Sequence, residues 1–114
     1  MWRCICCERP NIVGFQCISC EVFDREDAAL GGRAIRKQIT VYFSQDKKGP
    51  SMDILVYLPK DKVKPVPLFL GLNFGGNHTV QMDPRIRLST RWMRGDRTGV
   101  VDHRATEESR GTRS

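Results

Sequence analysis

The chain has 114 residues, which is enough for one small domain and too few for two domains with separate hydrophobic cores. Hydrophobic residues make up 39% of it and charged residues 28%, a composition that is typical of globular proteins and not of fibrous or disordered ones. The longest apolar run, residues 66–74, is interrupted by Pro67, Gly71 and Asn73 and is shorter than the roughly 18 residues of a membrane-spanning helix. We therefore expect no membrane partner.

Nineteen basic and 13 acidic residues give a net charge of +6, and arginine carries much of the excess. Residues 85–114 contain eight arginines, no lysine and four acids. Such an excess can indicate nucleic-acid binding or an acidic substrate. No basic helix interleaved with aromatic residues accompanies it, so we interpret the arginines as a solvated surface, or as a surface that further protein covers. We expect no nucleic-acid partner.

All five cysteines lie within the first 20 residues. Two C-x-x-C pairs, Cys4/Cys7 and Cys17/Cys20, could together surround a Zn²⁺ ion. Their separation is shorter than the about 15–20 residues usual for this motif, neither pair is followed by glycine, and the fifth cysteine is left over. We therefore expect no metal or other cofactor, with zinc on these four cysteines as the alternative. Residues 1–20 are interpreted as a leader of unassigned role.

The next part of the chain has the pattern of a β-hairpin. Residues 21–32 are acidic and end in two glycines, which predicts a loop or a short helical turn closed by those glycines. Residues 34–43 alternate between apolar and polar side chains, with Lys37 as a polar exception on the apolar face. Residues 52–58 alternate more weakly after a polar loop. These patterns predict two antiparallel strands.

Residues 66–73 (VPLFLGLN) form a continuous apolar run between turn signals. Such a run predicts a strand buried on both faces, as in the parallel sheet of an α/β fold. In open α/β sheets ligands bind at the carboxyl ends of strands, and two consecutive glycines follow this one. Glycine allows a positive φ or a close approach of the backbone to a ligand. We therefore identify a candidate active-site loop composed of Asn73, Phe74, Gly75, Gly76, Asn77 and His78.

Beyond this loop, residues 79–114 lose regular periodicity. They contain turn signals and many arginines, and their clear candidates for burial are Trp92, Met93, Val100 and Val101. A segment of this length without regular structure is unusual in a compact domain. We interpret it as an elaborate loop that other protein supports.

Several of these segments carry a resemblance to a known family. They are residues 65–79 (PVPLFLGLNFGGNHT), where the pattern is most specific, and residues 29–38 (ALGGRAIRKQ), 52–59 (MDILVYLP), 86–89 (IRLS), Trp92 and 103–111 (HRATEESRG). Together they resemble the N-terminal part of the glucuronoyl esterases, carbohydrate esterase family fifteen, and especially its bacterial members. The resemblance runs from about residue 21 to residue 111.

This resemblance implies an incomplete α/β-hydrolase fold, with the hairpin, the third buried strand and the glycine-rich loop present and the later strands missing. The family hydrolyses esters between glucuronic acid on xylan and lignin alcohols by a Ser/His/acid mechanism without a metal, which implies glucuronoxylan as the polysaccharide partner. The expected domains are the cysteine-rich leader, residues 1–20, and a fragment of the esterase domain, residues 21–114. Family members are usually exported, but Glu8, Arg9 and Pro10 precede any apolar signal segment, so localisation stays open.

The sequence departs from the family in its catalytic motif. The nucleophile elbow of the family resembles Gly-Cys-Ser-Arg-x-Gly, and the nearest stretch here, residues 107–111 (EESRG), has Glu107 where the first glycine must allow a sharp turn. Without a nucleophile and a base there is no covalent catalysis. We therefore expect no catalytic residue in this chain and no activity of the chain alone. The alternatives are a small zinc-binding interaction module and a non-catalytic remnant.

Two histidines and the glycine-rich loop are the remaining candidates for a chemical role. We interpret His78 and His103 as structural residues bonded to the backbone, because acid–base catalysis needs a positioned partner. The backbone N–H groups of Phe74 and Gly75 are stronger candidates for binding an oxyanion, since glycine permits the necessary turn.

Overall fold

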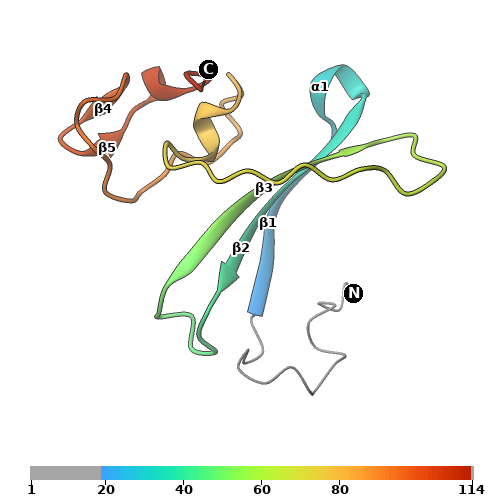
Figure 1. Ribbon diagram of the computed structural model, residues 1–114, viewed down its shortest axis with the longest axis horizontal. Helices are drawn as coiled ribbons and strands as arrows, with labels where there is room; N and C mark the ends of the chain where they lie inside the picture. The colour runs from blue at the N-terminus through green and yellow to red at the C-terminus, as the bar shows by residue number, and fades with distance from the viewer. Residues whose placement is uncertain (1–18, 114) are drawn as a thin grey trace. The chain divides into compact units, whose positions relative to one another are not determined.

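The computed structural model describes residues 19–113, and Figure 1 shows their course. The chain divides into two compact units, Met1–Pro65 and Val66–Ser114. Within the described range, no helix is long and apolar enough to span a membrane. In chain order the elements are β1 (Ser19–Ala28), α1 (Ala29–Gly32), β2 (Ala34–Tyr42), β3 (Ser51–Pro59), the 3₁₀ turn η2 (Asn77–Thr79), β4 (Val100–Val101), β5 (Arg104–Ala105) and the 3₁₀ turn η3 (Glu107–Ser109).

The first unit is a three-stranded antiparallel sheet in the order β1-β2-β3 (Figure 1). The predicted hairpin is confirmed, because β2 and β3 pair in register from Ala34 opposite Pro59 to Tyr42 opposite Ser51. Residues 21–32 were expected to form a loop or a short turn. For residues 21–28 this expectation is wrong, because they belong to strand β1, which pairs with the other edge of β2. The acidic residues of β1 obscured its strand character, and pairing places Glu26 directly opposite Arg36.

The turn between β1 and β2 has the predicted glycines in left-handed backbone conformations. The φ angles of Gly31 and Gly32 are +69° and +82°, and that of Leu30 is +54°. Glycine adopts these angles without the steric cost that a side chain brings. The prediction of a short turn closed by the two glycines is therefore confirmed.

A β-bulge in β1 decides which face of the sheet Asp24 occupies. The register shifts between Val22, which pairs with Ile39, and Asp24, which pairs with Gln38. One extra residue in the strand thus moves Asp24 onto the face of Gln38 and Arg36. Its Oδ2 accepts hydrogen bonds from Arg36 Nη2 at 3.0 Å and from Gln38 Nε2 at 2.8 Å.

The most completely buried face of the central strand β2 is polar. Arg36, Gln38 and Thr40 are 0%, 2% and 6% exposed, whereas the alternating residues Ile35 and Ile39 are only half-buried. The buried polar groups are paired across the sheet, since Thr40 Oγ1 donates to Asp53 Oδ1 at 2.8 Å and Asp24 binds the other two. A buried charge such as that of Arg36 needs such a partner. The opposite, apolar face is left partly open to solvent.

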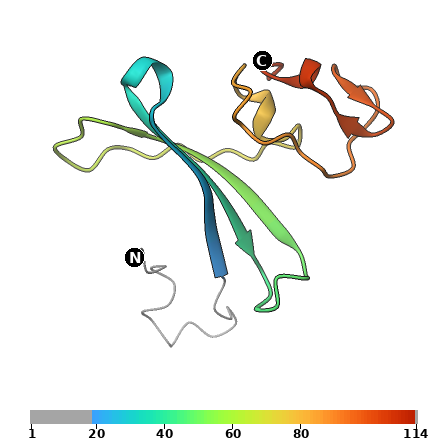
Figure 2. The ribbon, with the colours of Figure 1, turned by 180° about the vertical axis from the view of Figure 1, so that it is seen from behind.

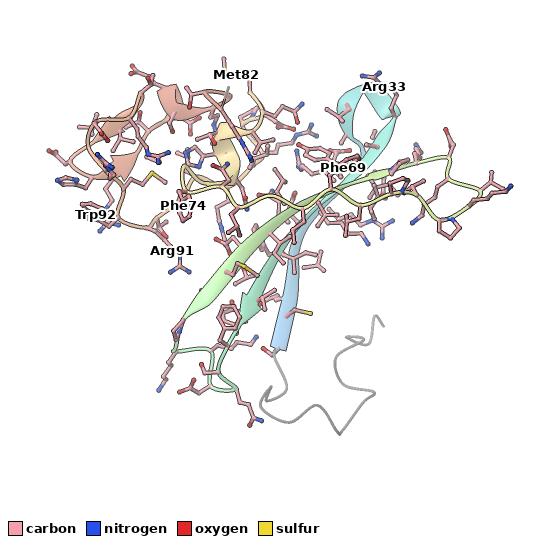
Figure 3. All side chains as sticks on the ribbon, viewed as in Figure 1. Arg33, Phe69, Phe74, Met82, Arg91 and Trp92 are labelled. Atoms are coloured by element: carbon pink, nitrogen blue, oxygen red, sulfur yellow. The ribbon has the colours of Figure 1, made fainter. Side chains whose placement is uncertain are left out.

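The second unit begins with an extended segment where a buried strand was predicted. Residues 66–73 form no strand with any described part of the chain, and Leu68, Phe69 and Leu70 are 79%, 94% and 87% exposed. Figure 2 shows the segment as coil, and Figure 3 shows the side chain of Phe69 on it. The prediction of a third buried strand is therefore wrong for this structure. A strand forms only where a neighbour completes its hydrogen bonds, and its apolar faces need covering layers.

The rest of this unit has little regular structure, as predicted for residues 79–114. Ile86 and Met93 are its buried large hydrophobic residues in the part that the structure describes. The prediction of burial is confirmed for Met93, whereas Val100 is half-buried and Trp92 and Val101 are 66% and 58% exposed. Much of the packing in this unit is instead polar, and it centres on the candidate loop.

Candidate functional site

The amide of Asn73 organises the candidate active-site loop. Its Nδ2 donates to the carbonyl oxygen of Gly76 at 2.8 Å and to Thr79 Oγ1 at 3.0 Å. Its Oδ1 accepts the N–H of Gly75 at 3.0 Å. Thr79 Oγ1 in turn donates to the carbonyl oxygen of Gly76 at 2.8 Å. One side chain thus joins both ends of the loop and satisfies backbone groups that have no strand partner.

Gly76 occupies a backbone conformation that requires glycine. Its φ and ψ are +91° and 155°, a region that residues with a side chain rarely adopt. A Cβ atom at this position would lie 2.6 Å from His78 Cε1 and 3.2 Å from Ser89 Cβ. The glycine therefore serves both the turn and the close approach of the imidazole ring.

The two backbone donors proposed for an oxyanion differ in availability. The N–H of Gly75 already donates to Asn73 Oδ1, and Gly75 itself is buried. The N–H of Phe74 donates no hydrogen bond within residues 19–113, and Phe74 is 84% exposed. Figure 3 shows the side chain of Phe74 on the loop. Of these two N–H groups, only that of Phe74 is therefore available to a ligand.

His78 is fully buried beneath this loop. Its Nδ1 accepts the backbone N–H of Ser89 at 3.3 Å, so the neutral ring carries its proton on Nε2, which has no partner among the described residues. Burial lowers the pKa of His78 below 6.5, the positive charge of Arg110 lowers it further, and Glu107 opposes them. The ring is therefore neutral at pH 7. Its backbone contact is the structural role expected for it.

Acidification should destabilise the packing around His78. Because the folded chain lowers the pKa of this histidine below its ordinary value of 6.5, opened states bind a proton more readily as the pH falls through 6.5. The free energy of opening should be greatest above pH 6.5 and should decrease toward the folded pKa. An NMR titration of the ring in the native chain and in urea measures both pKa values. Native titration at or above the value in urea would contradict the expectation.

Arg110 connects η3 to residues 83–86. Its Nε and Nη2 donate to the two carboxylate oxygens of Glu107, and Nη1 donates to the carbonyl oxygens of Asp83 and Ile86. Arg110 is only 8% exposed. Its hydrogen bond and positive charge lower the pKa of Glu107 below 4.5. The bidentate geometry fixes the planar guanidinium, and the two backbone carbonyls gain a charged donor.

His103 also has a backbone partner. Its Nδ1 donates to the carbonyl oxygen of Met93 at 2.9 Å, and the N–H of Met93 donates to the carbonyl oxygen of His103 at 3.0 Å. The imidazole stacks on Trp92 with a centroid distance of 4.9 Å. His103 therefore positions the turn between β4 and β5, as expected for a structural histidine.

A pocket of about 290 Å³ adjoins the candidate loop within the second unit. Asn73 and Gly75 of the loop contribute to its wall, and Arg97 and Arg113 bring two guanidinium groups. The remaining lining residues are Thr79, Asp96, Thr98, Val100, Ser109 and Thr112. The sequence analysis noted the arginine excess but not this pocket, because no local pattern brings residues 73, 97 and 113 together.

The described residues hold no nucleophile paired with a base. The hydroxyl of Ser109, in the stretch closest to the family motif, is buried and donates to the carbonyl oxygen of Thr106 at 2.5 Å. Neither His78 nor His103 contacts a serine hydroxyl within residues 19–113. What the loop and pocket offer is a backbone N–H donor and positive charge. These groups can stabilise an anion but cannot attack an ester without a nucleophile.

Three of the four cysteines of the zinc alternative, Cys4, Cys7 and Cys17, lie outside the described residues. The fourth, Cys20, is exposed in β1 opposite Val41. From residue 19 to residue 113, no group of three or more His, Cys, Asp and Glu side chains is arranged to hold a metal ion. The zinc alternative therefore receives no support here.

No protein-family model matches the chain. A carbohydrate esterase named MZ0003, from an unknown prokaryotic organism, is 48% identical over 86 residues. That alignment covers 75% of this chain and 20% of the relative. Among solved structures, a glucuronoyl esterase from Solibacter usitatus superposes with a TM-score of 0.68 and is 45% identical over 82% of this chain. The chain is homologous to one part of the glucuronoyl esterases.

A second solved structure agrees with this assignment. It is a promiscuous CE15 esterase from the marine bacterial metagenome, with a TM-score of 0.71 and 45% identity over 83% of this chain. The resemblance to glucuronoyl esterases is therefore confirmed, and the chain corresponds to a portion of an α/β-hydrolase-type esterase. It spans about 23% of the length of both solved structures.

Proposed function

We propose that this chain is one part of a carboxylic-ester hydrolase that acts on glucuronoyl esters of xylan, and that it is inactive alone. The observation that carries the proposal is its 45% identity and TM-score of 0.68–0.71 to glucuronoyl esterases of which it spans 23%. Such agreement over most of the chain favours the same position within a larger domain. The absence of a nucleophile–base pair from residues 19–113 is consistent with inactivity of the part.

Exposed apolar surface supports a role as part of a larger domain. Residues 66–73 expose Leu68, Phe69, Leu70 and Leu72 by 77–94%. An apolar extended segment without a strand partner is suited to pair with a further strand and to be covered by helices. Single exposed apolar residues are normal on protein surfaces, but a contiguous run indicates an interface. The occupant that we propose is the remaining three quarters of an esterase of this family.

In the completed enzyme, the candidate loop would assist the chemistry that other residues carry out. We assign its oxyanion contribution to the N–H of Phe74, because the N–H of Gly75 is held by Asn73 Oδ1. An N–H donor aimed at the developing negative charge stabilises the transition state of ester hydrolysis. The Asn73 hydrogen bonds and the conformation of Gly76 hold the loop in place for this role.

Complementation tests the proposed function. The chain is co-expressed with the Solibacter usitatus esterase lacking the 23% that this chain matches, and hydrolysis of a benzyl glucuronate ester is measured. We expect no hydrolysis by either part alone and restored hydrolysis by the pair. Activity toward acetylated xylan, measured in parallel, tests the substrate class. The relative's own matching segment is the positive control.

A pair of variants tests the proposed interface in that experiment. Leu70→Asp should abolish complementation. The side chain of Leu70 lies in the middle of the apolar segment and is 87% exposed in this chain, but the proposed interface would cover it. An unpaired carboxylate buried in that interface would be costly. Val63→Asp is the matched control, since Val63 is 96% exposed outside that segment, and it should complement normally. Hydrolysis by the chain alone would overturn the proposal. So would failure of the pair where the relative's own segment succeeds.

A further inference from the structure

The two edge strands of the sheet differ in how well they are protected against pairing with another strand. β1 and β3 lie on either side of β2, so each has one edge that no described strand covers (Figure 1). Five of the ten residues of β1 are charged, and the bulge between Val22 and Asp24 interrupts its regular backbone. Charged side chains and bulges both prevent an edge strand from pairing further. The outer edge of β1 is therefore protected.

Strand β3 has neither of these protections. Its nine residues (SMDILVYLP) include one charged side chain, that of Asp53, and their proline is the last residue, Pro59. It pairs with β2 without a register shift over its whole length. A regular edge strand with little charge is a template on which a further strand can form backbone hydrogen bonds. The edge that is suited to a partner strand is therefore that of β3.

The hydrogen bonds at the two ends of β3 establish which of its residues face that edge. The N–H of Phe43 donates to the carbonyl oxygen of Pro50 at 3.1 Å, and the N–H of Lys60 donates to the carbonyl oxygen of Arg33 at 3.0 Å. Bonded and non-bonded pairs alternate along antiparallel strands. The even-numbered residues of β3 therefore turn their backbone groups toward β2, and the odd-numbered residues turn theirs away from it. Leu55, at the centre of the strand, is one of the odd-numbered residues.

We infer that β3 pairs with β3 of a second copy of this chain, antiparallel and centred on Leu55, to form a two-fold symmetric dimer. This alignment opposes all nine residues of each strand and places Leu55 opposite Leu55 of the second copy. It also places Asp53 opposite Tyr57 of the second copy. An alignment centred on Asp53 would instead oppose two carboxylates, which is unfavourable. Overlap and charge therefore select the same register.

Apolar side chains match across the proposed junction. Met52 would lie opposite Leu58 of the second copy and Ile54 opposite Val56, with all four on the apolar face of the sheet. Met52 is 41% exposed and the other three are half-buried, so each has surface left for a partner. The two-fold contact uses the β3 edge of both copies and leaves the protected β1 edges at the ends, so assembly stops at the dimer. The inference does not rest on the proposed esterase role, because this chain alone forms the dimer.

Two measurements on the full chain test the dimer. Sedimentation velocity over a range of concentrations should show an equilibrium between monomer and dimer. In the same range, the outward N–H of Leu55 should exchange with solvent more slowly as the concentration rises, whereas the N–H of Ile54, which faces β2, should not respond. A chain that stays monomeric, or a Leu55 amide that does not respond to dimer formation, would overturn the inference.

Charged variants locate the contact. Leu55→Lys should weaken dimerisation at least about tenfold, because it opposes two ammonium groups at the two-fold axis. Val22→Lys is the matched control, since Val22 is 50% exposed on β1, and it should dimerise as the wild type does. Leu55→Glu should also dimerise weakly, but an equimolar mixture of Leu55→Lys and Leu55→Glu should recover the dimer, because opposite charges then face each other. Equal weakening by Val22→Lys, or no recovery in the mixture, would overturn pairing through β3.

One further variant separates this contact from the exposed apolar segment, residues 66–73. Leu70→Asp places a charge in the middle of that segment, where Leu70 is 87% exposed, and leaves β3 unchanged. We expect its dimerisation to equal that of the wild type. Loss of the dimer in Leu70→Asp would assign the association to the apolar segment and overturn the inference.

Discussion

Replacement of Gly99 by alanine should open the segment between β4 and η3. The φ angle of Gly99 is +71°, and a Cβ atom there would lie 2.2 Å from the backbone nitrogen of Ser109 and 2.5 Å from the carbonyl carbon of Glu108. Backbone atoms cannot yield as a flexible side chain does. Gly99→Ala should therefore lower the free energy of opening of this segment by about 3–4 kcal/mol.

Hydrogen exchange at two amides measures this effect. The N–H of Thr106 donates to the carbonyl oxygen of Gly99 at 2.9 Å, and that of Ser109 donates to Thr106 at 3.0 Å. Both should lose protection in Gly99→Ala. Gly95→Ala is a control in the same unit, because a Cβ atom there would meet only the His103 ring at an ordinary 3.5 Å. Equal protection in the two variants would refute the steric explanation.

Replacement of Arg110 by glutamine should separate η3 from residues 83–86. The variant loses the two contacts with Glu107 and leaves the carbonyl oxygens of Asp83 and Ile86 without their Arg110 donor. A buried acceptor left without its charged donor carries a desolvation cost, so we expect a loss of about 2–4 kcal/mol in the free energy of opening. Exchange of the Ile86 amide, which donates to Asp83 at 3.1 Å, reports this loss.

An exposed arginine pair provides the control for this variant. Arg94 and Asp96 are 2.9 Å apart with side chains 72% and 63% exposed, so Arg94→Gln should change the free energy of opening by less than about 0.5 kcal/mol. Arg110→Lys separates charge from geometry. It should lose the two-point contacts but keep the pKa of His78 low, whereas Arg110→Gln should raise that pKa. A loss in Arg94→Gln as large as in Arg110→Gln would argue against the buried contacts as its cause.

The sequence by itself determined the hairpin of β2 and β3, the glycine turn that precedes it, and the family. Alternation in residues 34–43 and 52–58 is a local signal, because neighbouring side chains of a strand point to opposite faces. Gly31 and Gly32 mark a turn for an equally local reason, their positive φ. In residues 21–28 acidic side chains interrupt the alternation, so the sequence predicted a loop there. The strand β1 is identified only by its pairing with β2.

Only the tertiary structure decided which face of β2 is buried and what surrounds the candidate loop. The bulge in β1 brings Asp24 to Arg36, and this pairing allows a charged residue to be fully buried. Glycine is required at position 99 because a Cβ atom there would collide with the backbone of Ser109. The pocket beside the candidate loop brings together residues 73, 97 and 113. Such contacts depend on residues far apart in the sequence, so no local period reveals them. The apolar run at residues 66–73 shows the converse, because apolar composition specifies a buried strand only where partners complete it.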